Sequence, residues 1–275
     1  MIAVSAATLS VWQACLLGAV QGLTEFLPVS SSGHLAVVQH FLPAMPSEEK
    51  VAVDVALHLG TLVALLVYFR GELWAMARSL GAHPPAGHAR RWIWLVGLAT
   101  LPTAIAGLAL REYVEASFDS LLVIGGCFLV TGVLLFFASA VRGADRTEDA
   151  LGPRDALVVG LFQVIAILPG LSRSGSTISG ALFRRTRADV AAKFSFLMAI
   201  PAVAGAIVLE GRPLLAIPPG LRVSLAAGIA TALVTGFLAI ALLLRIVRSG
   251  KLRYFAYYCW AIGIAVVATA VVGAG

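Results

Sequence analysis

The sequence has few charged residues for its length. Only 12% of its 275 residues are Asp, Glu, Lys or Arg, whereas 60% are hydrophobic. A soluble domain carries about 25% charged residues, because its surface must face water. The shortage of charge excludes a soluble globular protein and predicts an integral membrane protein that crosses the bilayer several times.

Cysteine and N-terminal positive charge are also scarce. The three cysteines, Cys15, Cys127 and Cys259, lie in apolar stretches without metal-site spacing, so we expect small packing residues and no disulfide. No Lys or Arg precedes Lys50, so the positively charged start of a cleaved signal peptide is missing. The net charge of +6 is expected in the loops of a membrane protein, and we expect no nucleic-acid partner.

Long hydrophobic stretches dominate the rest of the sequence. A helix needs about 20 apolar residues to cross the bilayer core. Six stretches come close to this length, at 51–69, 92–110, 120–141, 194–209, 221–244 and 254–273. Two further apolar regions, 9–42 and 155–185, are interrupted by Pro, Ser and Gly. We predict an all-α polytopic membrane protein with six transmembrane helices and two re-entrant helix pairs.

The distribution of positive charge supports re-entrance. If both interrupted regions enter and leave on the same face, six crossings place 16 of the 20 Lys and Arg residues on one side. The side rich in positive charge is cytoplasmic, so both termini are predicted outside. If each interrupted region crossed once, the Arg-rich segments 70–91 and 184–193 would lie on opposite sides.

The two interrupted regions also resemble each other. A shift of 142 residues aligns SSSG at 30–33 with SRSG at 172–175, and Gln21 with Gln163. The distribution of Lys and Arg predicts that the first region enters the membrane from outside and the second from the cytoplasm. We therefore predict a single membrane domain, 1–275, with inverted repeats at approximately 1–141 and 142–275. Their interrupted centres should meet near the bilayer midplane and line a polar cavity.

The first interrupted centre, residues 21–35 (QGLTEFLPVSSSGHL), is called the first tip below. Its polar residues include Glu25, Ser30, Ser31, Ser32 and His34. Gln21 and Glu25 are four residues apart, on one face of a helix. An ionisable group inside a membrane segment costs at least a few kcal/mol unless it is paired or hydrated, so Glu25 and His34 are candidate functional residues. The serines are equally compatible with helix capping.

The second interrupted centre, residues 169–180 (PGLSRSGSTISG), is called the second tip. Arg173 lies between Ser172 and Ser174, and Thr177 follows at the start of an apolar run. Arg, hydroxyl groups and the free N–H groups of a helix N-terminus are how proteins bind phosphate. The ordinary alternative is an Arg that snorkels to the membrane interface. Together, the tips indicate phosphoryl chemistry on an amphiphile with a charged head and a lipid tail.

The strings EFLPVSSSGH and PGLSRSGSTISG resemble the two signature regions of the undecaprenyl-diphosphate phosphatase family, also called bacitracin resistance proteins. The likeness covers essentially the whole chain in order and spacing. It implies a hydrolase of the bacterial plasma membrane that converts undecaprenyl diphosphate into undecaprenyl phosphate, the lipid carrier for cell-wall precursors. It also implies dependence on a divalent cation, Mg²⁺ or Ca²⁺, and a site open to the outer face. The sequence does not specify the oligomeric state, and a homodimer is compatible with it.

The resemblance places functional roles on residues of both tips. The catalytic residues would be Glu25, Ser31, His34 and Arg173. The phosphate-binding residues would be Ser30, Ser32, Ser172, Ser174 and Thr177. The metal ligands would be Glu25, Gln21 and Asp54.

Several of these roles leave alternatives open. Many family members have Glu where this chain has Gln21, which brings no charge to a metal site. Asp54 and His58 lie where relatives often have Glu and Gln, and packing at a span end explains them equally well. Ser31 would attack phosphorus or orient a water, with His34 as general base or acid; His34 as the nucleophile is a third route.

Two other functions fit parts of the sequence. Inverted repeats with broken helices are also a transporter architecture, so the chain could flip undecaprenyl phosphate. A phosphatidic-acid-type lipid phosphatase also uses an SGH string and an SR string. That family's basic first motif and its final His followed by Asp are absent here. The carboxylate, serine and histidine beside an Arg favour chemistry over transport.

Overall fold

The computed structural model describes residues 9–42, 46–81 and 87–273, and the regular secondary structure in this part of the chain is helical, without a β-strand. The α-helices, in chain order, are α1 (Val11–Phe26), α2 (Ser31–His40), α3 (Ser47–Tyr68), α4 (Arg70–Gly81), α5 (Gly87–Ala109), α6 (Arg111–Ser117), α7 (Leu121–Ser139), α8 (Pro153–Ile165), α9 (Arg173–Phe183), α10 (Ala188–Glu210), α11 (Pro219–Arg248) and α12 (Arg253–Gly273). Short 3₁₀ helices occupy Glu148–Ala150 and Arg212–Ala216.

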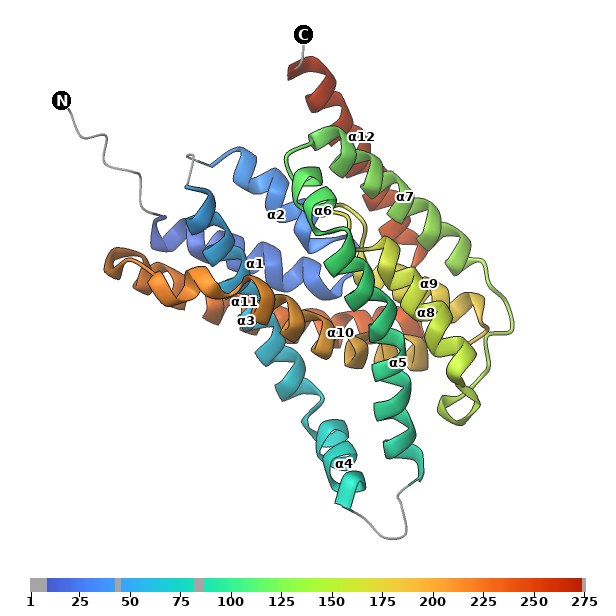
Figure 1. Ribbon diagram of the computed structural model, residues 1–275. Coiled ribbons are helices and arrows are strands. Elements are labelled where there is room, and N and C mark those ends of the chain that lie inside the picture. The colour runs from blue at the N-terminus through green and yellow to red at the C-terminus, as the bar shows by residue number, and fades with distance from the viewer. Residues whose placement is uncertain (1–8, 43–45, 82–86, 274–275) are drawn as a thin grey trace, which may run out of the picture.

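Six of these helices are long and apolar enough to cross a bilayer, namely α3, α5, α7, α10, α11 and α12. They match the six stretches predicted from hydrophobicity, with ends that differ by a few residues. The prediction of a polytopic all-α membrane protein is therefore confirmed. In Figure 1, α3 runs down to α4 at the bottom of the molecule, and α12 ends at the top.

The two interrupted regions form pairs of short helices. The helices α1, α2, α8 and α9 have 16, 10, 13 and 11 residues, fewer than the roughly 20 needed to span. The first break follows Phe26, where Leu27 is extended and Ser30 has a φ of 69°. The second break contains Gly170 at a φ of 91°, a conformation that glycine adopts without steric cost.

The two breaks share the same local structure. The Ser30 hydroxyl caps α2 by accepting from the Gly33 N–H at 3.4 Å, and the Ser172 hydroxyl caps α9 by accepting from the Gly175 N–H at 3.0 Å. These caps satisfy backbone donors that a helix start leaves free. The internal similarity seen in the sequence is thus present at the breaks. The inverted orientation of the repeats and their boundaries stay predictions.

The outer ends of the second helix pair lie together. Asp155, at the start of α8, binds Arg184 at the end of α9, with 2.8 Å between Oδ1 and Nε. Arg146 also binds Asp155, at 2.8 Å, and its backbone pairs with Thr186. The start of α8 and the end of α9 therefore lie at the same end of the helix pair, as a pair that enters and leaves the membrane on one face requires.

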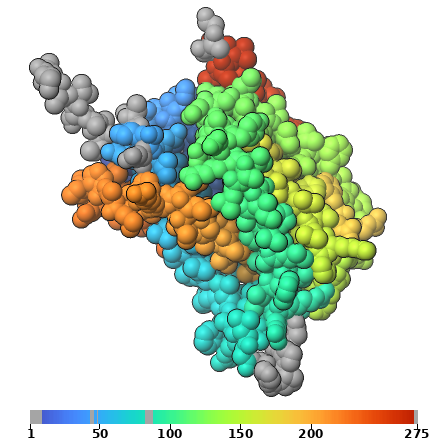
Figure 2. Space-filling view, in the orientation of Figure 1, coloured from blue at the N-terminus to red at the C-terminus, as the bar shows by residue number. Residues whose placement is uncertain are grey.

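Small residues bring the helices close. A Cβ at Gly22 on α1 would lie 2.7 Å from the Gly236 nitrogen of α11, and one at Gly18 would lie 3.1 Å from the Thr231 Cβ. Such close backbone approach is typical of membrane helices, whose association relies on packing. In the space-filling view, α5 crosses the front, with the orange end of α10 and start of α11 on its left and α8 on its right (Figure 2).

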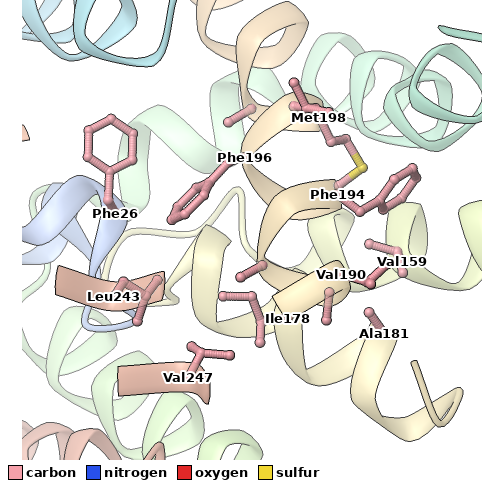
Figure 3. Packing of buried hydrophobic residues seen from close by; sticks show 14 of the residues in the cluster. Phe26, Val159, Ile178, Ala181, Val190, Phe194, Phe196, Met198, Leu243 and Val247 are labelled. Carbon is pink, nitrogen blue, oxygen red and sulfur yellow. The ribbon is translucent and has the colours of Figure 1, made fainter. Parts of the chain in front are cut away.

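The largest apolar cluster lies behind the two tips. Phe26, at the end of α1, meets Phe196 of α10 edge to face, with ring centroids 5.7 Å apart (Figure 3). Ile178 of α9 is fully buried in the same cluster. Because both breaks rest against this core, their polar groups are held on a rigid support. The three cysteines are free, and Cys127 and Cys259 are buried, as expected for packing residues.

Candidate functional site

The two tips contact each other directly. The Ser174 hydroxyl of the second tip donates to the Leu27 carbonyl of the first at 3.1 Å. A Cβ at Gly33 would lie 2.8 Å from the Gly170 Cα, so the backbones approach to a distance that only glycine allows. The expected meeting of the tips is therefore found in the structure.

An ion pair joins the tips at their centre. Arg173 is the first residue of α9, and Glu25 lies in the last turn of α1. The Arg173 Nη2 lies 2.5 Å from the Glu25 Oε1, and the two side chains are only 15% and 7% exposed. Buried charges of this kind are stable when paired, because an isolated one loses its hydration. The fold thus places one anion and one cation at the junction.

The second carboxylate oxygen of Glu25 is surrounded by polar groups. The Ser31 hydroxyl donates to Oε2 in a short hydrogen bond. The Gln21 Nε2 donates to the same oxygen at 3.1 Å, and the His58 Nε2 lies 3.8 Å away. A carboxylate that accepts the proton of a serine hydroxyl is placed to act as its general base. Glu25 therefore takes the position next to Ser31 that the sequence suggested for His34.

His34 points toward α12. Its Nδ1 lies 2.7 Å from the Ser30 carbonyl oxygen, and its Nε2 lies 2.7 Å from the Tyr258 hydroxyl. The Phe128 ring meets the imidazole edge to face, with centroids 5.0 Å apart. Within the described residues, no hydrogen bond joins His34 to Ser31, although both residues begin the same short helix. His34 is thus in the site, on the side of Tyr258.

The predicted phosphate-binding residues lie at the starts of α2 and α9, and their hydroxyls already have partners. Ser172 caps the helix, Ser174 binds the other tip, and the hydroxyls of Ser30 and Ser32 lie 3.3 Å apart. The Thr177 Oγ1 lies 2.6 Å from the Ser195 Oγ of α10. Arg173 differs, because its Nη1 is buried and has no hydrogen-bond partner among the described residues. It is the donor best placed to receive an anion.

The residues predicted to bind a divalent cation are only partly brought together. Gln21 and Glu25 are in contact, and the Gln21 Oε1 is buried with no hydrogen-bond partner in the described part of the chain. The Asp54 carboxylate instead accepts from the Gln39 Nε2 of α2 at 2.6 Å. Within the described residues, no group of three His, Cys, Asp or Glu side chains has the arrangement of a metal site. Because carboxylate and amide oxygens are ligands that Mg²⁺ and Ca²⁺ accept, Gln21 and Glu25 fit such an ion.

Three polar residues of the spanning helices were not anticipated. The Thr131 Oγ1 of α7 donates to the Gly170 carbonyl at 3.0 Å and accepts from the Ser172 N–H at 3.1 Å, which holds the second break. Ser195 binds Thr177, and Tyr258 binds His34. Their one sequence signal is a hydroxyl inside an apolar span, which is a weak indicator because such hydroxyls also bond within their own helix.

Comparison with known proteins places this site in a family context. Residues 14–265 match the family described as bacitracin resistance protein BacA. An undecaprenyl-diphosphatase of Syntrophotalea carbinolica is 46% identical over 259 residues, which cover 93% of this chain and 97% of that protein. Proteins of the same name from Alkaliphilus metalliredigens and Thermomicrobium roseum are 40% and 42% identical and cover 94% and 93% of this chain, and 98% and 96% of their own lengths. Both tips lie inside the matched region.

Proposed function

Because the chain belongs to the BacA family of bacitracin resistance proteins, we propose that it is a membrane phosphatase that hydrolyses undecaprenyl diphosphate. The products are undecaprenyl phosphate and inorganic phosphate. Undecaprenyl phosphate is the lipid carrier that cell-wall synthesis uses again, and its recycling confers resistance to bacitracin. The two tips, which resemble the family's signature regions, both lie within the matched residues 14–265.

One observation carries this proposal, namely that Glu25 touches both Arg173 and Ser31. The three groups are a base, an anion-binding cation and a nucleophile, and they meet where two distant segments of the chain join. Hydrolysis of a phosphoanhydride uses a base, a group that attacks or that orients the attacking water, and a cation that binds the phosphate. A carrier that only moves a lipid has no need of a base beside a serine.

In the proposed reaction, the Ser31 Oγ attacks the terminal phosphorus while its proton passes to Glu25. The bond between that phosphorus and the bridging oxygen breaks, and undecaprenyl phosphate leaves with the bridging oxygen. Water then cleaves the phosphoserine and releases inorganic phosphate. A water molecule held by Ser31 and deprotonated by Glu25 would give the same products in one step, and a trapped phosphoserine distinguishes the two routes.

Arg173 would stabilise the transferring phosphoryl group. Its unpartnered Nη1 is available to a phosphate oxygen, and its Nη2 can leave Glu25 once that carboxylate has accepted a proton. The N–H groups at the start of α9 add a positive dipole end beside it. Charge that builds on the phosphoryl oxygens in the transition state is then met by donors already in place.

Gln21 and, while its carboxylate is ionised, Glu25 would hold the divalent cation, Mg²⁺ or Ca²⁺, through their side-chain oxygens. The ion would neutralise charge on the diphosphate. Asp54 would be a third ligand only if the hydrogen bond from Gln39 to its carboxylate were broken. The Gln21 Oε1, buried and free of other hydrogen bonds, supports the assignment.

The protein is expected to be a multi-pass protein of the bacterial plasma membrane, with the site open to the outer face and both termini outside. The uneven distribution of Lys and Arg between the two sides supports this orientation. The partner that binds the site is a lipid diphosphate, whose prenyl tail would remain among apolar helix faces. Assembly as a homodimer stays a prediction that a mass measurement in detergent can check.

The function is tested by incubating purified protein in detergent micelles with undecaprenyl diphosphate. We expect inorganic phosphate and undecaprenyl phosphate in equal amounts, and loss of both after treatment with a chelator. Readdition of Mg²⁺ should restore the reaction. Because detergent micelles support no gradient, turnover would also exclude transport as the sole function.

A further inference from the structure

Tyr258 makes a close contact with the catalytic region from a helix at the far end of the chain. Its hydroxyl lies 2.7 Å from the His34 Nε2, and the planes of the two rings differ by only 5°. The next residue, Cys259, is buried, and its Sγ lies 3.7 Å from the Pro28 carbonyl oxygen. This part of α12 therefore packs against the first tip at two successive residues, and the contact with His34 is part of that packing.

The other side of the imidazole fixes its tautomer. The His34 Nδ1 lies 2.7 Å from the Ser30 carbonyl oxygen, which can only accept a hydrogen bond, so Nδ1 carries a proton. In the neutral ring, Nε2 then has a free lone pair and accepts from the Tyr258 O–H. In the charged ring, Nε2 carries a proton and donates to the Tyr258 oxygen. A tyrosine hydroxyl can serve both forms, and a phenylalanine can serve neither.

The ring of His34 is also fixed in orientation. Phe128 of α7 is fully buried and meets the imidazole edge to face at 5.0 Å between centroids. With Ser30 on one nitrogen, Tyr258 on the other and Phe128 against the ring, rotation about the side-chain bonds would break at least one of these contacts. A residue that acts as acid or base must be held in this way to work efficiently.

We infer that Tyr258 is a positioning residue for His34. The Ser30 carbonyl fixes the tautomer, and the hydroxyl of Tyr258 holds the imidazole in one orientation and leaves Nε2 hydrogen-bonded whether His34 is neutral or charged. This inference rests on the proposed phosphatase function and on the role of general acid or base that the family resemblance implies for His34. It adds α12 to the elements that build the site.

The test compares Tyr258→Phe with Tyr257→Phe. The two tyrosines are neighbours on α12 and equally exposed, at 46% and 47%, but the Tyr257 ring faces Trp260 at 6.0 Å between centroids. With undecaprenyl diphosphate as substrate, Tyr258→Phe should lower kcat about threefold to tenfold and leave KM unchanged, because one hydrogen bond to the acid–base group is lost. Tyr257→Phe should match the wild type.

A spectroscopic measurement reports on the hydrogen bond between His34 and Tyr258 independently of phosphate release. In ¹⁵N-histidine-labelled protein, the His34 signals are identified by their loss in His34→Gln. We expect the Nε2 signal to move in Tyr258→Phe and to stay in place in Tyr257→Phe. An unmoved signal would overturn the inference, as would a raised KM with unchanged kcat, which would mean that Tyr258 holds the substrate itself.

The two proposals fail in different ways. If wild-type protein releases no phosphate from undecaprenyl diphosphate, the proposed function is wrong, yet the nitrogen signal still decides whether Tyr258 fixes His34. If the wild type is active and Tyr258→Phe is indistinguishable from it in both measurements, the positioning role is wrong and the phosphatase function stands.

Discussion

Arg173 Nη2 lies 2.5 Å from Glu25 Oε1, and this ion pair joins residues that are 148 positions apart in the chain. It is the one charged contact between the two tips in the described part of the chain. Both side chains are largely buried, so removing either one would leave the other charge without its partner. The pair therefore serves the packing of the tips as well as the proposed chemistry, and conservative variants are the informative ones.

Arg173→Lys keeps the positive charge and removes the forked geometry of the guanidinium. We expect this variant to fold and to lose roughly 100- to 1,000-fold in the rate of phosphate release, because one ammonium cannot reach both Glu25 and a phosphate oxygen. Arg154→Ala, which removes an exposed arginine at the start of α8, is the control and should keep the wild-type rate. A wild-type rate in Arg173→Lys would contradict the proposal that the guanidinium must contact both Glu25 and the phosphate.

Gln21→Glu tests the proposed cation site. A second carboxylate beside Glu25 should bind a divalent cation roughly tenfold more tightly, because charge on the ligands raises affinity. The measurement is Mn²⁺ binding followed by electron paramagnetic resonance, together with the Mg²⁺ concentration that gives half-maximal activity. Gln13→Glu on the same helix is the control, since Gln13 only caps the start of α1. Equal affinities in both variants would remove Gln21 from the site.

Gly33→Ala tests the closeness of the tips. The added Cβ would lie 2.8 Å from the Gly170 Cα and 2.7 Å from the Phe128 ring, so the tips would have to separate. We expect activity to fall roughly 10- to 100-fold, because small displacements of reacting groups are costly. Gly126→Ala on α7 meets nothing within 4 Å and should be harmless. Similar activities for the two variants would show that close approach at Gly33 is not needed.

Asp155 should stabilise the protein in a pH-dependent manner. Burial alone would raise the pKa of its carboxyl, but hydrogen bonds from Arg146, Arg184 and the Gly152 N–H outweigh it and lower the pKa to about 2. Because the folded pKa lies below the unfolded value of about 3.9, the stabilisation is complete above that value and is lost as the pH falls through about 2.

Asp155→Asn should therefore cost about 2 kcal/mol of unfolding free energy at neutral pH, with the difference shrinking between about pH 4 and pH 2. Thermal unfolding in detergent micelles measures this. Glu115→Gln is the control, because the Glu115 side chain is 57% exposed and pairs with Arg111 at the surface, where ion pairs contribute little. A constant difference across the pH range would contradict the account of Asp155.

The sequence predicted the helices better than the contacts between them. Hydrophobic length identified the six spans, and the Pro, Ser and Gly residues within 9–42 and 155–185 identified both breaks, because these features depend on local chemistry. The meeting of the two tips also followed, since irregular polar backbone inside a membrane must be surrounded by protein, but the ion pair between Glu25 and Arg173 was not predicted. The sequence did not predict which hydroxyl donates to which acceptor.

The missed contacts depend on the relative rotation of helices. Ser31 donates to Glu25, His34 contacts Tyr258, and Asp54 accepts from Gln39. These contacts form because α2 packs against α1, α3 and α12 at the same time. No local pattern in the sequence specifies that rotation. A tyrosine in an apolar span is also indistinguishable, by sequence alone, from one at the membrane interface.

The most direct test of the account is the rate of phosphate release from undecaprenyl diphosphate by wild-type protein and by Glu25→Gln, both purified in detergent. The amide keeps the size of Glu25 and can still accept from Ser31, but it cannot take the serine proton. We predict steady release by the wild type and a rate at least roughly 100-fold lower in Glu25→Gln. Equal rates in the two proteins would contradict the assignment of catalysis to the site where Glu25, Ser31 and Arg173 meet.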